Sequence, residues 1–168
     1  DLTDRDLEDL FRVNVFGPIY AIQFALPFLK ETKCGQIINI TSVLARTAVP
    51  YMAAYCATKH ALHALTKSLR VELKESAVRV IEVGPGLTAT EFQKNARSEA
   101  LGGKPLLHNR TGASAESVAR SILSASRRGG REKWLTLGGR SLIFLQERLP
   151  RLTDWGLGRW GRSVRSRL

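Results

Sequence analysis

Apolar residues at the start of the chain recur every three or four positions, which is the spacing of one helix face. The pattern predicts a long helix over about residues 3–33, opened by a Thr3 cap and ended near Cys34-Gly35. Gly17-Pro18 predicts a bend inside this helix, and Pro27 predicts a second irregularity. The apolar positions of this helix are Leu7, Leu10, Phe11, Ile22, Phe24, Ala25 and Leu29.

Two short apolar runs rich in β-branched residues predict strands buried on both faces, at 36–41 and 78–83. A loop at 42–50 and a second long helix over about residues 51–75 separate them. Residues 84–112 form a loop region with helix-like pieces.

The last part of the pattern continues the alternation of helix and strand. Residues 114–117 form a cap that predicts a helix over 118–126, and 133–137 predict a short strand. Helix, strand, helix, strand, helix, strand is typical of a doubly wound α/β fold with a Rossmann-like parallel sheet.

Tyr55 and Lys59 lie four residues apart, so the second long helix carries both side chains on one face. A free tyrosine titrates near pH ~10, and a fixed positive charge beside it favours the phenolate. Such a group suits general acid–base catalysis, whereas the alternative is an exposed helical pair without chemistry. Alone, the spacing occurs in roughly one of seven shuffled chains, so it is weak evidence.

Two polar residues upstream strengthen the interpretation of Tyr55 and Lys59 as a functional pair. Ser42 ends the first predicted strand, at the edge where open α/β sheets bind ligands. Asn14 lies among apolar neighbours on the first helix, where a buried amide needs a hydrogen-bond partner.

At these residues the chain resembles the short-chain dehydrogenase/reductase family, over about residues 1–137. The motifs are Asn-Val-Phe-Gly at 14–17, the strand that ends at Ser42, Tyr55-x-x-x-Lys59, and Gly-Pro-Gly at 84–86. The set is expected in roughly a few of ten thousand shuffled chains, so it is specific.

The resemblance implies a catalytic set made of Asn14, Ser42, Tyr55 and Lys59. Tyr55 would exchange a proton with the substrate oxygen, and Ser42 would hydrogen-bond that oxygen. Lys59 would lower the Tyr55 pKa and bind the nicotinamide ribose. Asn14 would hold a water that links Lys59 to solvent.

The resemblance also implies NAD or NADP as cofactor, bound by Tyr55, Lys59 and the turn after the second strand. In that turn Pro85 and Gly86 would meet the nicotinamide ring, and Thr88 or Thr90 its carboxamide. The alternative is an ordinary strand-to-loop turn. Residues 91–109 would form a flap over the substrate, with apolar side chains that line a pocket or pack as core.

No Gly-rich phosphate-binding turn precedes Asp1, so we expect the C-terminal part of a Rossmann-like protein. Residues 1–138 would belong to its catalytic domain, and residues 139–168 would form a basic and apolar C-terminal extension. The residues that distinguish NAD from NADP would lie upstream.

The net charge of +11 is concentrated at the end of the chain, because residues 127–168 alone carry +8. Tryptophans and leucines interleave with this charge, which suits peripheral contact with an anionic membrane. The alternative is an extension that packs over the substrate cleft or a partner subunit, and Pro150 breaks any continuous helix there. Nucleic-acid binding is disfavoured because no matching fold motif is present.

Composition and cysteines limit the remaining classes. The chain is 43% apolar and has no run near the ~20 residues that span a bilayer. Cys34 and Cys56 do not have the spacing of a metal-binding or redox-active pair, so they suit reduced thiols in the cytoplasm. His60 and His63 lack a third residue that could complete a metal site. We therefore expect a cytoplasmic or membrane-peripheral protein without a metal.

The leading hypothesis is an oxidoreductase that transfers hydride between NAD(P) and a small-molecule substrate with an alcohol or carbonyl group. The rival hypotheses are a cofactor-binding scaffold on the same fold, or an inactive fragment with an exposed sheet edge. The family's interface helices correspond to 3–33 and 51–75, so the resemblance also implies a homo-oligomer. Neither the substrate nor the direction of the reaction follows from the sequence.

Overall fold

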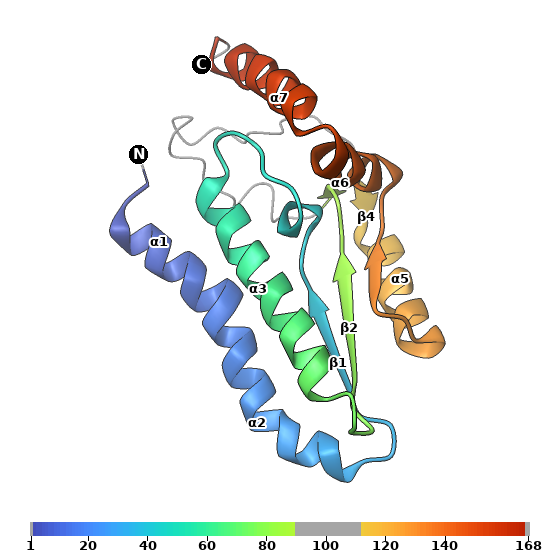
Figure 1. The fold of residues 1–168 in the computed structure, drawn as a ribbon. Coiled ribbons are helices and arrows are strands. Elements are labelled where there is room, and N and C mark those ends of the chain that lie inside the picture. Colours follow the sequence, from blue (N-terminus) through green and yellow to red (C-terminus); the bar gives the residue numbers. More distant parts are fainter. Residues whose placement is uncertain (1, 90–111, 167–168) are drawn as a thin grey trace.

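The computed structural model describes residues 2–89 and 112–166. Its main sheet has three parallel strands, β1 (Gln36–Ile40), β2 (Arg79–Gly84) and β5 (Glu132–Trp134), in the order β1-β2-β5. Figure 1 shows these strands side by side, with their C-terminal ends at the same edge. The parallel sheet with its helices is the predicted Rossmann-like α/β fold.

Apolar side chains from alternate strand positions build a core on each face of this sheet. On one face Ile37 and Val80 pack with Leu69, against partly buried residues from the first helices. On the other face Ile81 and Val83 pack with Ala125. Because both faces are covered, the strands are continuous apolar runs rather than alternating ones.

The predicted first helix is three consecutive elements, α1 (Asp4–Phe11), a π-helical turn η1 (Arg12–Phe16) and α2 (Gly17–Glu31). Thr3 caps α1, since its hydroxyl accepts a hydrogen bond from Asp6 N at 3.2 Å. The irregularity lies just before Gly17-Pro18, in the wide turn that carries Asn14. Such turns are frequent at functional sites.

The second long helix is α3 (Ala53–Glu72), which lies beside α1 and α2 in Figure 1. It begins two residues later than predicted, because Tyr51 has a left-handed backbone with φ of 66°. Between β1 and α3 the chain forms one 3₁₀ turn, η2 (Val43–Ala45), which Ser42 caps.

The region after β2 differs from the predicted loop. Residues Thr88–Ala89 form β3, which pairs in parallel with β4 (Ala113–Ser114). Ser114 caps α5 (Ala115–Arg128), which is longer than the predicted helix at 118–126. The predicted flap at 91–109 and Thr90 lie outside the described residues.

The end of the chain forms two helices, α6 (Leu137–Arg148) and α7 (Pro150–Arg165). The predicted strand at 133–137 is therefore wrong at its end, because Thr136 caps α6 through Gly139 N at 3.2 Å. As expected, Pro150 separates the two helices. Both lie at the edge of the sheet where the strands end (Figure 1).

Two glycines allow this edge to close. A Cβ on Gly84 would lie 2.0 Å from Cε3 of Trp134, and one on Gly139 would lie 2.4 Å from Cγ2 of Val43. Only glycine therefore allows Trp134 to pack on β2 and α6 to pack on the turn after Ser42. No helix in the described ranges is long and apolar enough to cross a membrane.

Candidate active site

The end of β1 and the first turns of α3 bring Ser42 and Tyr55 together. Ser42 follows the strand directly, and its hydroxyl accepts a hydrogen bond from Leu44 N at 3.1 Å. The side chains of Ser42 and Tyr55 are hydrogen-bonded to each other. The loop of residues 43–52 that joins them turns back over the sheet edge, so two residues thirteen positions apart share one site.

Burial dominates the electrostatics of the Tyr55 phenol. Desolvation raises the pKa of Tyr55 above its ordinary value, the Ser42 hydrogen bond acts in the lowering direction, and Cys56 adds to the rise. The net shift of the Tyr55 pKa is therefore upward, and the lowering effect of the Lys59 ammonium stays a prediction. In this environment the phenol keeps its proton at neutral pH.

Lys59 lies one turn beyond Tyr55 and faces it. Its Nζ is 5.7 Å from the centroid of the Tyr55 ring, and it donates a 3.5 Å hydrogen bond to Ile40 O at the end of β1. Burial lowers the pKa of the Lys59 ammonium. Ser42, Tyr55 and Lys59 thus form one half-buried cluster at the carboxyl end of the sheet.

Asn14 reaches the same helix through Thr58, a residue that the sequence reasoning missed. Asn14 Nδ2 donates to Thr58 Oγ1 at 3.3 Å, and Thr58 Oγ1 donates to Tyr55 O at 2.8 Å. Thr58 is fully buried. The π-helical turn is therefore tied to the backbone of the residue that carries the phenol.

The turn after β2 lies against the loop that carries Ser42. Val43 N donates to Pro85 O at 2.9 Å, and Thr41 N donates to Val83 O at the same distance. Within the turn, Thr88 Oγ1 donates to Gly86 O at 3.2 Å. Pro85 therefore lies against the loop that carries Ser42, and the contact of Pro85, Gly86 and Thr88 with the cofactor stays a prediction.

A buried polar group lies directly behind the cluster and was also missed. Glu82, on β2, is fully buried and accepts a hydrogen bond from Thr41 Oγ1 at 2.8 Å. Its Oε2 is 2.8 Å from His63 Nδ1. Tyr55, Lys59 and His63 follow one another at four-residue spacing, which is the signal that could have placed His63 on the sheet-facing side of α3.

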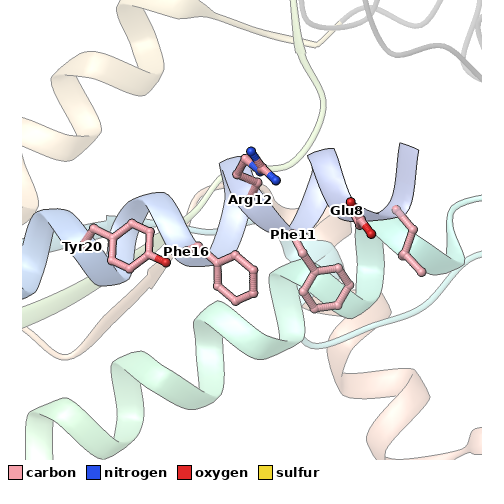
Figure 2. Close-up of a pocket in the computed structure, with 6 residues that line it drawn as sticks. Glu8, Phe11, Arg12, Phe16 and Tyr20 are labelled. Atoms are coloured by element: carbon pink, nitrogen blue, oxygen red, sulfur yellow. The ribbon is translucent and has the colours of Figure 1, made fainter. Parts of the chain in front are cut away.

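A hollow of about 600 Å³ lies elsewhere, along the outer side of α1, η1 and α2. Figure 2 shows the lining side chains and labels Glu8, Phe11, Arg12, Phe16 and Tyr20. None of the residues that line it belongs to the predicted catalytic set. It is an open, mainly apolar surface, so we place the chemistry at the strand ends.

Comparison with known proteins agrees with this arrangement. The family model described as short chain dehydrogenase matches residues 1–101. A dehydrogenase/reductase SDR family protein 7-like from Anopheles gambiae is 33% identical over 85% of this chain and 46% of its own length. A 3-amino-tetrahydro-pyrrolizinone reductase from Xenorhabdus hominickii is 47% identical over 53% of this chain and 31% of its own length.

The fold matches solved structures as well. The crystal structure of a short chain dehydrogenase from Burkholderia cenocepacia, in complex with NADP, is 26% identical with a TM-score of 0.79. The match covers 92% of this chain and 62% of that one. The chain spans about half or less of the length of these two curated relatives. Motifs, fold and relatives agree, and the chain belongs to the short-chain dehydrogenase family.

Proposed function

We propose that the protein transfers hydride between NAD(P) and an alcohol or carbonyl substrate, with Tyr55 as proton donor and acceptor. The observation that carries the proposal is the hydrogen bond between Ser42 and Tyr55 beside the Lys59 ammonium. The relatives named as dehydrogenases and reductases, and the NADP complex of the Burkholderia protein, support it.

The cluster fits a nicotinamide cofactor by its donors. An ammonium carries three N–H groups. Among the described residues Lys59 makes one hydrogen bond, at 3.5 Å, which leaves N–H groups that can donate to ribose hydroxyls. The turn of Pro85 and Gly86 follows a strand at the sheet edge where such cofactors bind. Thr88 and Thr90 remain our proposed partners of the carboxamide.

In the reductive direction, bound NAD(P)H supplies a hydride to the carbonyl carbon. Tyr55 gives its phenolic proton to the carbonyl oxygen, which becomes the hydroxyl of the alcohol. Ser42 donates a hydrogen bond to the same oxygen, where negative charge develops. Asn14 holds a water through which Lys59 and Tyr55 recover the proton from solvent.

A stripe of aromatic side chains that begins at the end of η1 and continues along α2 supports a homo-oligomer. Phe16, Tyr20, Phe24 and Phe28 follow one another at four-residue spacing, and Phe24 is 78% exposed. The rings contact along the stripe, with centroids 6.5 Å apart for Phe16 and Tyr20 and 6.0 Å for Phe24 and Phe28. An apolar face of this length suits a second copy of the chain.

The direction of the Tyr55 pKa shift predicts how activity depends on pH. The raised pKa keeps the phenol protonated, so we expect carbonyl reduction to stay constant between about pH 6 and 8. Alcohol oxidation needs the phenolate, so its kcat/KM should rise about tenfold for each pH unit over that range.

The experiment follows NAD(P)H absorbance in the full-length protein with panels of carbonyls and alcohols, in both directions and across this range. A protein that is folded and binds NAD(P)H but turns over no member of either panel would favour the scaffold hypothesis. An oxidation rate that does not change with pH would remove Tyr55 as the base.

A further inference from the structure

The outer faces of α6 and α7 combine exposed apolar and basic side chains. On α6, Leu137, Arg140, Phe144 and Arg148 recur at three- and four-residue spacing, so they share one side of the helix. On α7, Leu152, Trp155, Arg159 and Arg162 do the same. The large exposed apolar members are Leu137 at 79%, Trp155 at 63%, Phe144 at 59% and Leu152 at 56%, and Leu149, between the two helices, is 47% exposed.

The inner faces of the same helices are fixed to the loop that precedes Tyr55. Gln146 of α6 exchanges two hydrogen bonds with the backbone of Ala48, at 3.1 and 3.3 Å. Tyr51 donates from its hydroxyl to Gly161 O of α7 at 3.0 Å. These contacts fix which side of each helix faces outward, so the exposed apolar residues belong to one defined surface.

Charge distinguishes this surface from the aromatic stripe of η1 and α2. Residues 137–166 carry six arginines, all exposed, and two acidic residues, a net charge of +4. Residues 1–33, with the aromatic stripe, carry four basic and six acidic residues, a net charge of −2. Pairing the basic surface with its own copy would set arginines against arginines, which is unfavourable.

We propose that the outer face of α6 and α7 docks on an anionic lipid bilayer. Interleaved arginines and large apolar side chains, with a tryptophan, are the pattern of helices that lie in the membrane interface. The apolar side chains enter the headgroup boundary while the arginines meet lipid phosphates. The helices have 12 and 16 residues, so they lie along the surface and do not span it.

Docking in this orientation turns toward the bilayer the sheet edge at which the strands end, where the candidate active site lies. Tyr51, which α7 holds by its hydrogen bond, is four residues before Tyr55. We therefore infer that the substrate is an apolar alcohol or carbonyl taken from the lipid phase. This second step rests on the proposed function, whereas the docking itself does not.

The test is co-sedimentation of the full-length protein with vesicles. One set is pure phosphatidylcholine and the other contains about one third phosphatidylglycerol. We expect binding to the anionic vesicles that falls steeply with added salt, together with a blue shift of tryptophan emission that is lost in Trp155→Phe. Absence of binding, or equal binding to both vesicle types, would overturn the proposal.

Variants on α7 test the docking surface, and matched variants on α5 are their controls. Leu152→Ser should lower the partition coefficient about tenfold, whereas Leu123→Ser, at 55% exposure, should leave it unchanged. Likewise Arg151→Glu with Arg159→Glu should abolish anionic binding, whereas Arg127→Glu with Arg128→Glu should not. If the two double variants weaken binding equally, the net charge of the protein causes the attraction, and the outer face of α6 and α7 has no docking role.

The same variants separate docking from function. If docking is confirmed but turnover of long-chain carbonyls is unchanged by anionic vesicles, delivery from lipid is wrong and docking stands. If no carbonyl is reduced at all, the proposed function fails while the vesicle result is unaffected.

Discussion

Replacing Tyr55 by Phe is expected to lower kcat for carbonyl reduction by about 10²–10⁴-fold. The substitution removes one oxygen, so the ring keeps its position over Lys59 while the proton donor is lost. Binding of NAD(P)H should stay within about threefold of wild type, because Lys59 and the turn after β2 are unchanged. The measurement is single-turnover oxidation of NAD(P)H, with the cofactor Kd taken from fluorescence.

Tyr20→Phe is the matched control for this variant. Tyr20 lies on α2, outside the cluster of Ser42, Tyr55 and Lys59, and its ring stays in Tyr20→Phe, so removing its hydroxyl should leave turnover unchanged. If Tyr55→Phe retains turnover within a few-fold while the protein stays folded, another group donates the proton and our assignment is wrong.

Glu82→Ala is expected to lower the free energy of unfolding by about 3 kcal/mol or more. Glu82 is fully buried and hydrogen-bonded to both Thr41 and His63. Its removal leaves a buried hydroxyl and an imidazole without their acceptor, and it also leaves a cavity beside β2. Urea unfolding followed by circular dichroism measures the loss.

Glu147→Ala is the control, since Glu147 pairs with Arg46 at an exposed position. That pair should contribute at most about 1 kcal/mol. Equal losses in the two variants would show that the buried group has no special role. We also expect Glu82→Gln to lower the free energy of unfolding less than Glu82→Ala, because the glutamine amide keeps an acceptor for the Thr41 hydroxyl.

The strands and long helices were predictable because their apolar periodicity reflects burial. Ile37 and Val80, for example, pack on one face of the sheet and Ile81 and Val83 on the other, and each comes from a continuous apolar run. The clustering of Ser42, Tyr55 and Lys59 was also predictable, since a strand end and the first turns of the next helix meet at one edge.

Features that depend on tertiary contacts were not predictable. The left-handed backbone of Tyr51 is accompanied by a hydrogen bond to Gly161, which is 110 residues away. Glu82 lies in an apolar run, and only the packed structure shows that Thr41 and His63 satisfy it. The upward shift of the Tyr55 pKa was not predictable, because sequence spacing shows a nearby lysine and conceals the degree of burial.

The most direct test of the central claim follows a deuterium label from the cofactor into the product. The full-length protein is incubated with NAD(P)H deuterated at the transferable position of C4 and with a carbonyl substrate from the panel, and the alcohol is analysed by mass spectrometry. We predict one deuterium on the former carbonyl carbon, none on oxygen after exchange into water, and a loss of product in Tyr55→Phe. Folded protein that binds the labelled cofactor but yields unlabelled alcohol, or none, would contradict hydride transfer.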